Sequence, residues 1–303
     1  MLASQTLKRR RAIRRGPGYV VGTVLIYAFV ILMALLCLLP FLHVLAKSIS
    51  SEALVAARRI ILIPHGVTLS AYRKICADAS ILQSMYVSVG MTLVFTALGL
   101  ALTVLAAYPL SRSYLRGRKG ISFLIMFTYY FTAGIIPDYL LVAKLGLLEN
   151  FWGLVLPLAF SPWNLLIMKT SLATSFPESL EESARIDGAN YFRILWQIVV
   201  PLSLPILTTI ALFLAVGRWN AYQDALFYIK QRTDLRPIQL KLYYLVIQAT
   251  ESFQSSESVV TVQTNPDVLK SACVMFATLP IVCVYPFVQK YFVQGIMIGA
   301  VKG

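Results

Sequence analysis

Long apolar runs constrain this chain more than any other feature of its sequence. A helix needs roughly 20 apolar residues to cross a bilayer, and six stretches approach or exceed that length. They are Tyr19–Leu45, Ser84–Leu110, Ile121–Ala143, Phe151–Met168, Ile198–Val216 and Ser271–Val288. Only 13% of the 303 residues are charged, whereas a soluble globular chain is usually about 25% charged. We therefore predict an all-α, polytopic membrane protein with six transmembrane helices.

A dense basic segment precedes the first apolar run. Residues Lys8–Arg15 read KRRRAIRR and lie in the polar N-terminus, residues 1–18. Such a cluster beside a span marks the cytoplasmic side and contacts acidic lipid headgroups. The net charge of +14 therefore predicts membrane lipid, and not nucleic acid, as a partner. A cleaved signal peptide is disfavoured, because the apolar run continues to Ala46 and a signal core has only about 7–15 residues.

Six spans with a cytoplasmic N-terminus place both termini in the cytoplasm. The basic residues of the loop 169–197 then fall on the cytoplasmic side, where such clusters are expected. The long segments 46–83 and 217–270 fall outside, and we expect them to fold as caps over the membrane domain, residues 19–303. The C-terminal tail, 289–303, returns to the cytoplasm.

Cysteine, histidine and glycine patterns give little sign of catalysis. The four cysteines are scattered, which implies neither a disulfide framework nor a metal site. His43 and His65 do not cluster with acids or cysteines. The glycine-rich loop of ATP-hydrolysing proteins is absent, and the stretch Arg116–Gly120 lacks its spacing. We therefore expect this chain to be no enzyme and to bind no cofactor of its own.

The stretch Glu181–Asn190, EESARIDGAN, is the most polar run in the second half of the chain. Before it, Ser175 followed by Glu178 fits a capping box. Gly188 is placed to end the helix in a left-handed turn, and Asn190 can cap a second helix that enters span five. The residues alone leave two interpretations open, a solvated loop and a docking surface for another protein.

The spacing within this stretch favours docking. Glu182-Ser183-Ala184 is followed by three residues, Gly188, nine residues and Ile198-Val199-Val200-Pro201. This resembles the signature of binding-protein-dependent ABC transporter permeases, E-A-A, three residues, G, nine residues, I-x-L-P, and departs from it at Ser183 and Val200. The run Tyr285–Gly303 and the segment Trp219–Tyr222 resemble the oligosaccharide-uptake branch, near the maltose transporter's smaller membrane subunit and its subgroup for uronate-containing oligosaccharides.

The resemblance implies a type I ABC importer permease fold in the bacterial plasma (inner) membrane. It implies three partners: a homologous second permease subunit, a dimer of ABC ATPase subunits that binds ATP and Mg, and an extracytoplasmic solute-binding protein. The signature loop would be a coupling helix in a cleft of the ATPase. The implied coupling residues are Glu181, Glu182, Ser183, Ala184, Arg185, Asp187, Gly188, Ala189 and Pro201. The tail residues Gly299, Lys302 and Gly303 are implied to reach the ATPase dimer interface.

Sugar contacts along the pathway are expected from aromatic faces, which stack on sugar rings, and from amides, which bind hydroxyls. The candidates are Tyr129, Tyr130, Trp163, Asn164, Trp219, Asn220 and Tyr222. Aromatic residues at helix ends more often form interfacial belts, so both interpretations stay open. The outer loops carry more basic than acidic residues, which is compatible with an acidic sugar of the alginate or pectin type.

Three other functions are weighed against this one. An ABC importer for a non-sugar solute would share the loop signature, although the C-terminal run favours sugar. A proton- or ion-coupled transporter usually needs acids or histidines at mid-membrane, and Asp138 is predicted about 26 Å along span three at 1.5 Å per residue, near its outer end. An integral membrane enzyme is disfavoured, because no cluster of His, Asp and Glu lies at a membrane face.

Overall fold

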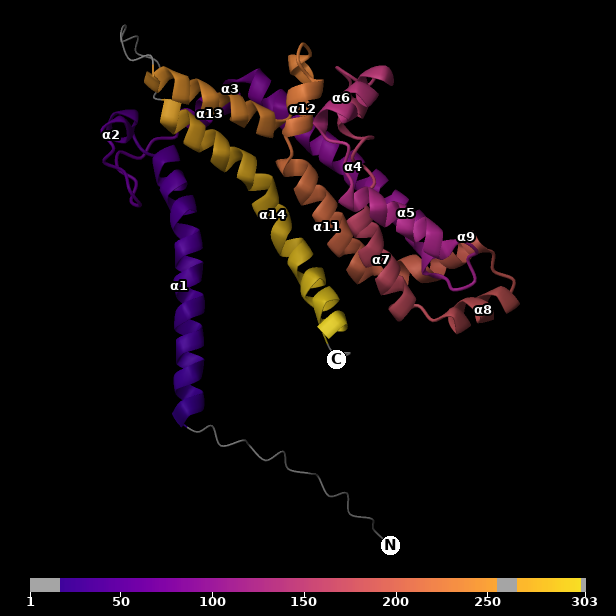
Figure 1. Ribbon diagram of the computed structural model, residues 1–303. Helices are drawn as coiled ribbons and strands as arrows, with labels where there is room; N and C mark the ends of the chain where they lie inside the picture. The colour runs from indigo at the N-terminus through magenta and orange to yellow at the C-terminus, as the bar shows by residue number, and fades with distance from the viewer. Residues whose placement is uncertain (1–16, 255–265, 301–303) are drawn as a thin grey trace.

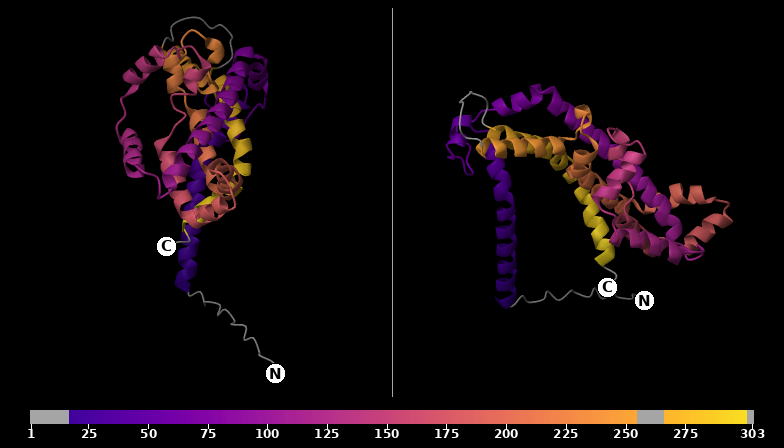
Figure 2. Two further views of the ribbon diagram at one scale, coloured as in Figure 1. Left: turned by 90° about the vertical axis from the view of Figure 1, so that its right-hand side faces the viewer. Right: turned by 45° about the horizontal axis from the view of Figure 1, so that its top comes forward.

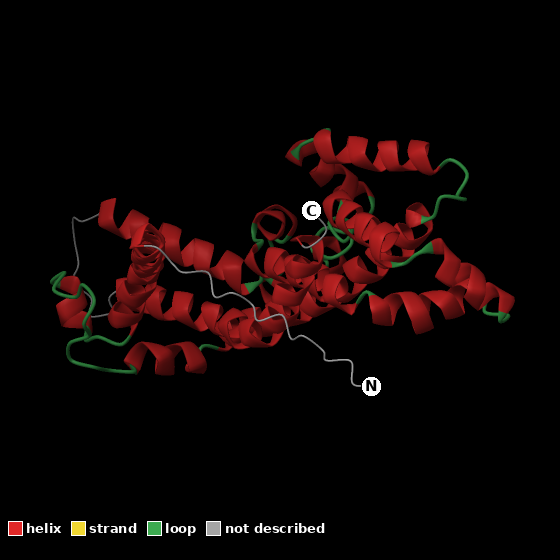
Figure 3. Cartoon of the chain, turned by 90° about the horizontal axis from the view of Figure 1, so that it is seen from below, coloured by secondary structure: helices red, strands yellow, loops and turns green. Residues whose placement is uncertain are grey.

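The computed structural model describes residues 17–254 and 266–300 of the chain. Every regular element in these two ranges is a helix (Figures 1 and 3), as the sequence predicts. The N-terminal half contains α1 (Pro17–Ser48), α2 (Glu52–Ala56), α3 (Ser70–Ala77), α4 (Ala79–Ser111), α5 (Arg118–Tyr130), α6 (Ile135–Lys144) and the 3-10 turn η1 (Phe151–Leu154). The C-terminal half contains α7 (Pro162–Ser175), α8 (Glu178–Ile186), α9 (Tyr191–Ile194), the π-helical turn η2 (Leu195–Val199), α10 (Val200–Leu202), α11 (Leu204–Asn220), α12 (Gln223–Tyr228), η3 (Thr233–Leu235), α13 (Ile238–Gln254) and α14 (Pro266–Ala300).

Helix α1 meets the other helices near its C-terminal end, and the rest of its length stands apart from them (Figures 1 and 2). Its side chains are mostly apolar and exposed until Ala46 and Ser48, which are buried near the contact with α14. A helix that is apolar on all faces has to be covered by lipid or by protein. The exposed length therefore fits the predicted first membrane span.

The centre of the molecule is built on α4, which packs against α7 and α11, while α11 also packs against α14. Buried side chains of these helices, among them Met91, Leu165 and Ile210, belong to one apolar cluster. Gly99 allows α4 to pass close to the segment before α7, because a Cβ there would lie 2.8 Å from the carbonyl oxygen of Ala159. This packing fixes the two helices whose ends meet at α8.

The third predicted span is broken. Helix α5 ends at Tyr130, α6 begins at Ile135, and the two helices are bent by 113°. Gly134 lies between them with φ +91°, a backbone conformation that glycine adopts readily and other residues rarely adopt. Asp138 therefore lies in the first turn of α6. The prediction that places it far along one straight helix is wrong.

The fourth predicted span also differs from a single helix. Residues Phe151–Leu154 form only a 3-10 turn, and α7 begins at Pro162. Ser161 caps α7 by accepting a hydrogen bond from the amide of Asn164 (3.3 Å), and proline suits the first position of a helix because it needs no amide donor there. The predicted start of this span is therefore too early.

The fifth predicted span contains a sharp bend. Residues Tyr191–Leu202 and Leu204–Asn220 are bent by 83° where they meet at Ser203. Pro201 and Pro205 flank the bend, and a proline both lacks an amide donor and crowds the preceding turn. The two prolines therefore account for the bend at the start of the span.

The described residues contain three helices long and apolar enough to cross a membrane, α1, α4 and α14, or up to five spans if each bent pair counts as one. Helix α7, with 14 residues, is shorter than a full span. The total of six spans and the cytoplasmic location of both termini therefore stay predictions. In Figure 1 the N-terminal end of α1 and the C-terminal end of α14 point toward the end of the molecule where α8 lies.

Candidate functional site

Helix α8 lies at one end of the molecule, beyond the end of α7 (Figure 1). The predicted capping box does not form, because Ser175 belongs to α7 and the N-cap of α8 is Pro177, which makes no side-chain cap. The Glu178 carboxylate instead reaches the loop after α4. Its two oxygens accept hydrogen bonds from the backbone amide (2.6 Å) and the hydroxyl (2.7 Å) of Ser113. The start of α8 is therefore held by a different part of the chain.

The end of α8 is the glycine stop that the sequence predicts. Gly188 has φ +80°, and its amide donates to the carbonyl of Arg185 (3.0 Å) while the amide of Ala189 donates to that of Ala184 (3.0 Å). This pair of hydrogen bonds is a Schellman motif, which satisfies the last carbonyls of a helix. The Asn190 side chain then caps α9 by accepting from the amide of Arg193 (2.8 Å).

One face of α8 is buried against α4. Glu181 pairs with Arg112 at 3.6 Å, and their side chains are 2% and 1% exposed. The hydroxyl of Tyr114 also donates to Glu181. Burial and the contact with Glu181 raise the pKa of Tyr114 well above its usual range, so the phenol stays a neutral donor. The buried carboxylate therefore has a cation on one oxygen and a hydroxyl donor on the other.

Arg112 connects this carboxylate to α7. Its guanidinium donates to the carbonyl oxygens of Phe176 (3.0 Å) and Leu172 (3.3 Å), and its Nε donates to the hydroxyl of Ser111 (3.0 Å). The guanidinium carbon also lies 4.9 Å from the centre of the Phe176 ring. The last carbonyls of a helix lack partners within it, so Arg112 satisfies the end of α7 and binds α8 with one side chain. We call Arg112, Tyr114 and Glu181 the inner joint.

The other face of α8 is open. Glu182, Ser183, Arg185 and Asp187 are exposed, and Ile186 is 87% exposed. The apolar surface continues onto α9, where Phe192 is 69% exposed. Exposed apolar groups beside charges are a common feature of protein docking surfaces.

The predicted coupling residues therefore divide into two groups. In the first group, Glu181 and Ala184 are buried and Ala189 is half-buried. The second group is exposed and consists of Glu182, Ser183, Arg185, Asp187, Gly188 and Pro201. The sequence gives no direct sign of Arg112 or Tyr114, although an arginine two residues after the long apolar run that ends at Leu110 is a detectable signal.

The predicted sugar-pathway residues lie in separate places. Tyr129 stacks on Trp163 with ring centres 5.9 Å apart and meets Tyr130 edge-on at 5.3 Å. Asn164, next to Trp163 in α7, is buried. Trp219 is also buried, and its indole N–H donates to the carbonyl of Ala277 in α14 (3.2 Å), so it joins two helices.

Asn220 and Tyr222 line a cavity of about 420 Å³ between the start of α6 and the end of α11. Tyr222 also stacks on Tyr243 of α13, with ring centres 4.9 Å apart. Asp138 and Asp224 lie in the same lining, and the Asp224 carboxylate is paired with Arg218 at 2.6 Å. This cavity therefore combines an amide, a phenol and two acids, which are groups that bind hydroxyls.

The predicted tail contact falls mostly outside the structure. Gly299 lies within α14, whereas Lys302 and Gly303 lie outside the described residues. Helix α14 runs through much of the segment predicted as a tail, since it continues to Ala300.

The fold agrees with that of a known transporter. The crystal structure of a bacterial ABC transporter involved in the import of the acidic polysaccharide alginate contains a chain that superposes with a TM-score of 0.81 and 31% sequence identity, over 91% of this chain and 98% of that one. The fold is therefore that of a type I ABC importer permease.

Sequence relatives point the same way. The polygalacturonan/rhamnogalacturonan transport system permease protein YtcP of Bacillus subtilis (strain 168) is 43% identical over 281 residues, which cover 92% of this chain and 97% of the relative. The trehalose/maltose transport system permease protein MalG of Thermococcus litoralis is 28% identical over 293 residues, 94% of this chain and 98% of the relative. The family described as binding-protein-dependent transport system inner membrane component matches residues 99–298. The chain belongs to this family of inner membrane permeases.

Proposed function

We propose that this chain is the transmembrane subunit of an ATP-driven importer of oligosaccharides, and that a separate ATPase moves it through α8. The observation that carries the proposal is the division of α8 into two faces. Glu181 fixes one face to α4 and α7, while Glu182 and Ile186 leave the other face free for a partner. A helix transmits a displacement only if it is fixed firmly to the element that it moves.

The proposed assembly needs three further components. Residues 1–303 contain no ATP-binding glycine loop, so ATP and Mg bind to a dimer of separate ATPase subunits. A homologous second permease completes the pathway, and an extracytoplasmic binding protein delivers the solute, in keeping with the family description. Closure of the ATPase dimer displaces α8, and the inner joint carries this displacement to α4, which changes access to the pathway from one side to the other.

An acidic oligosaccharide is the proposed substrate. The Bacillus relative is named for polygalacturonan and rhamnogalacturonan, and the structural neighbour for alginate. The basic excess of the outer loops fits such a substrate. The cavity beside Tyr222 contains Asp138 and Asp224, so we expect it to contact sugar hydroxyls while the sugar carboxylates lie elsewhere.

The test is reconstitution of all four components in proteoliposomes. We expect ATP-dependent uptake of oligogalacturonides. Glu182→Gln should lower uptake and the coupled ATP hydrolysis by about tenfold, the loss that corresponds to one charge-assisted hydrogen bond. Glu52→Gln, on the outer helix α2, is the matched control and should change neither.

Two outcomes would contradict the proposal. Uptake driven by a proton gradient without ATP would exclude an ATP-driven importer. Uptake of neutral malto-oligosaccharides in preference to oligogalacturonides would exclude the acidic substrate while leaving the transport mechanism intact.

A further inference from the structure

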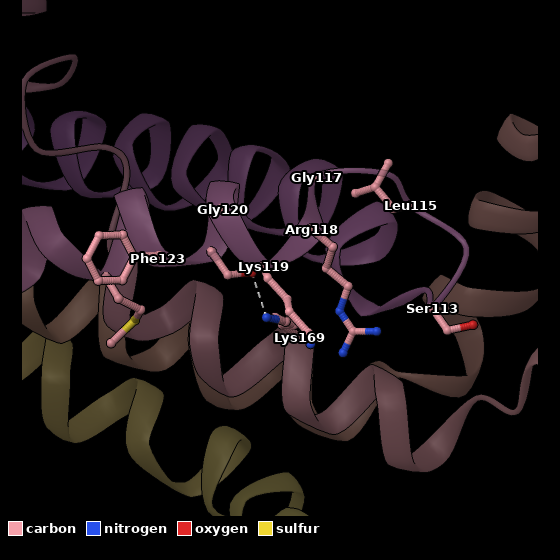
Figure 4. Close-up of a pocket in the computed structure, with 10 residues that line it drawn as sticks. Ser113, Leu115, Gly117, Arg118, Lys119, Gly120, Phe123 and Lys169 are labelled. Atoms are coloured by element: carbon pink, nitrogen blue, oxygen red, sulfur yellow. Dashed lines mark hydrogen bonds between the residues drawn. The ribbon is translucent and has the colours of Figure 1, made fainter.

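A cavity of about 750 Å³ lies between the first turns of α5 and the middle of α7 (Figure 4). It is on the α8 side of the molecule, since Ser113 of its lining binds Glu178. Three cationic side chains line it, Arg118 and Lys119 from α5 and Lys169 from α7. Within residues 17–254 and 266–300, no acid lines the cavity and none of these three cations is in an ion pair.

The surrounding groups neutralise only a small part of this positive charge. The Lys169 ammonium donates to the hydroxyl of Ser122 (2.7 Å), a neutral acceptor that holds it at the cavity wall (Figure 4). The nearby carboxylate of Glu178 attracts Arg118 but forms no ion pair with it, and its two oxygens accept hydrogen bonds from Ser113. The cavity therefore offers three donors with full positive charge to an anion from outside the chain.

An apolar track begins at the same cavity. Phe123 lines the cavity and is followed at helical spacing by Phe127 and Phe131, with ring centres 6.4 and 4.4 Å apart along the series. These side chains are 68%, 47% and 67% exposed. We call them the phenylalanine ladder. It extends about 12 Å along α5 at 1.5 Å per residue, close to the roughly 15 Å thickness of one leaflet's hydrocarbon.

We propose that this cavity binds an anionic phospholipid, whose phosphate lies among Arg118, Lys119 and Lys169 and whose acyl chain follows the phenylalanine ladder. A lipid satisfies the cations and the exposed rings with one molecule. A free phosphate would leave the ladder uncovered, and a single acidic sugar ring is too short to cover a ladder of about 12 Å. The proposal rests on the proposed function in one respect, the membrane orientation that places this cavity in the cytoplasmic leaflet.

The test measures lipid selectivity of the assembled transporter. The complex is equilibrated in nanodiscs with equal phosphatidylglycerol and phosphatidylcholine, and the lipids that stay bound are counted by native mass spectrometry. Each basic residue near an anionic lipid surface contributes roughly fivefold to binding. We therefore expect Arg118→Gln/Lys119→Gln/Lys169→Gln to reduce phosphatidylglycerol enrichment by at least about tenfold, and the exposed single variant Lys119→Gln by about fivefold.

Matched variants separate the contributions. Arg58→Gln/Arg59→Gln/Lys144→Gln removes the same charge from exposed positions on the predicted outer side and should leave the enrichment unchanged. Phe123→Ser/Phe131→Ser should reduce lipid enrichment but leave any binding of glycerol 3-phosphate unaffected.

Three results would overturn the proposal. The first is unchanged enrichment in both the triple variant and Lys119→Gln. The second is competition by glycerol 3-phosphate or galacturonate as strong as that by the lipid, without dependence on the ladder, which would identify a small-anion site. The third is cross-linking of the Lys119→Cys variant to the second permease, which would show that protein covers the cavity. Lipid retention needs no turnover, so these results are independent of the uptake test.

Discussion

Two buried arginine–carboxylate pairs are built differently, one on α8 and one on α12, helices that lie at opposite ends of the helical core (Figure 1). In the inner joint, Arg112 and Glu181 are 3.6 Å apart. At the other end, Arg218 of α11 and Asp224 of α12 approach to 2.6 Å, with side chains 1% and 9% exposed. Arg112 donates three further hydrogen bonds, whereas no nitrogen of the Arg218 guanidinium makes a hydrogen bond to the described residues. The pair with the shorter distance therefore has the poorer surroundings.

The two ion pairs also differ in the helices that they join. A buried ion pair repays the cost of leaving water only when its remaining donors and acceptors are satisfied. The Arg112 guanidinium meets this condition, since each of its nitrogens donates a hydrogen bond, although one oxygen of Glu181 accepts none from the described residues. Arg112 joins the end of α4 to residues of α7 and α8 that follow it by 60 or more positions in the chain. The pair of Arg218 and Asp224 joins two consecutive helices, and Arg218 also lies over the ring of Phe95 in α4. We therefore expect the α8 end to be rigid, as a mechanical joint needs, and the cavity end to open at lower cost.

The largest expected effect follows from removing the arginine of the inner joint. Arg112→Met leaves Glu181 buried without its cation and the end of α7 without its donor. Breaking a buried pair in this way costs about 3–5 kcal/mol, so we expect this variant to lose stability and to hydrolyse ATP without transport. Resistance to denaturant and the ratio of ATP hydrolysed to sugar imported are the measurements.

A control and a second variant keep this prediction testable. Arg116→Met removes an exposed arginine from the same loop and should change stability by less than about 0.5 kcal/mol. Arg112→Met/Glu181→Met removes both charges and should recover part of the lost stability. A double variant no more stable than the single one would show that the pair is not coupled.

The second prediction breaks the pair at the cavity end. Arg218→Met removes a cation that makes no hydrogen bond to the described residues, and Asp224 lines the 420 Å³ cavity, where water can solvate it. We expect a loss of about 1–3 kcal/mol, smaller than that of Arg112→Met in the same denaturation assay. Equal losses of stability would show that the three hydrogen bonds of Arg112 do not make the inner joint stronger than the pair of Arg218 and Asp224.

The sequence predicts the elements that depend on local chemistry. Apolar runs predict the helices. Gly188 and Asn190 predict the turn between α8 and α9, which we call the elbow, because a left-handed turn and a side-chain cap each depend on one or two residues. The break at Gly134 is missed because hydropathy measures affinity for lipid and stays high across Ile121–Ala143 whether or not the helix continues. The fold itself is identified by a spaced motif and not by apolar length.

The inner joint could not be predicted, because its residues meet only through packing. Arg112 ends a span, where a basic residue ordinarily indicates the cytoplasmic side. Glu181 and Glu182 are adjacent and chemically identical, and only the rotation of α8 decides that the first is buried and the second exposed. That rotation is set by contacts with α4 and α7.

The third prediction concerns the elbow that ends the rigid side. Gly188→Ala forces a side chain into a backbone with φ +80°, which costs about 1–2 kcal/mol, and should loosen α8 without affecting the cavity end. Gly90→Ala is the matched control, since its Cβ would meet open space within α4 and should be neutral or stabilising by up to about 1 kcal/mol. Hydrogen exchange of α8 amides reports the change, and equal protection in both variants would argue against the elbow.

The smallest effect concerns the exposed hydrogen bonds between Glu178 and Ser113. Glu149 is the counterpart at the cavity end, where its carboxylate accepts hydrogen bonds from the backbone amides of residues 230–232. The backbone and hydroxyl donors of Ser113, with the charges of Arg112 and Arg118, lower the pKa of Glu178 below its usual 4.5. A carboxylate with a lowered pKa stabilises the fold above its unfolded pKa, and this contribution is lost as pH falls through the folded value. We therefore expect proteolysis at the start of α8 to increase slightly as pH falls below 4.5. Glu178→Gln should remove this dependence while Glu182→Gln, on the open face, keeps it; the same dependence in Glu178→Gln would assign it to another group.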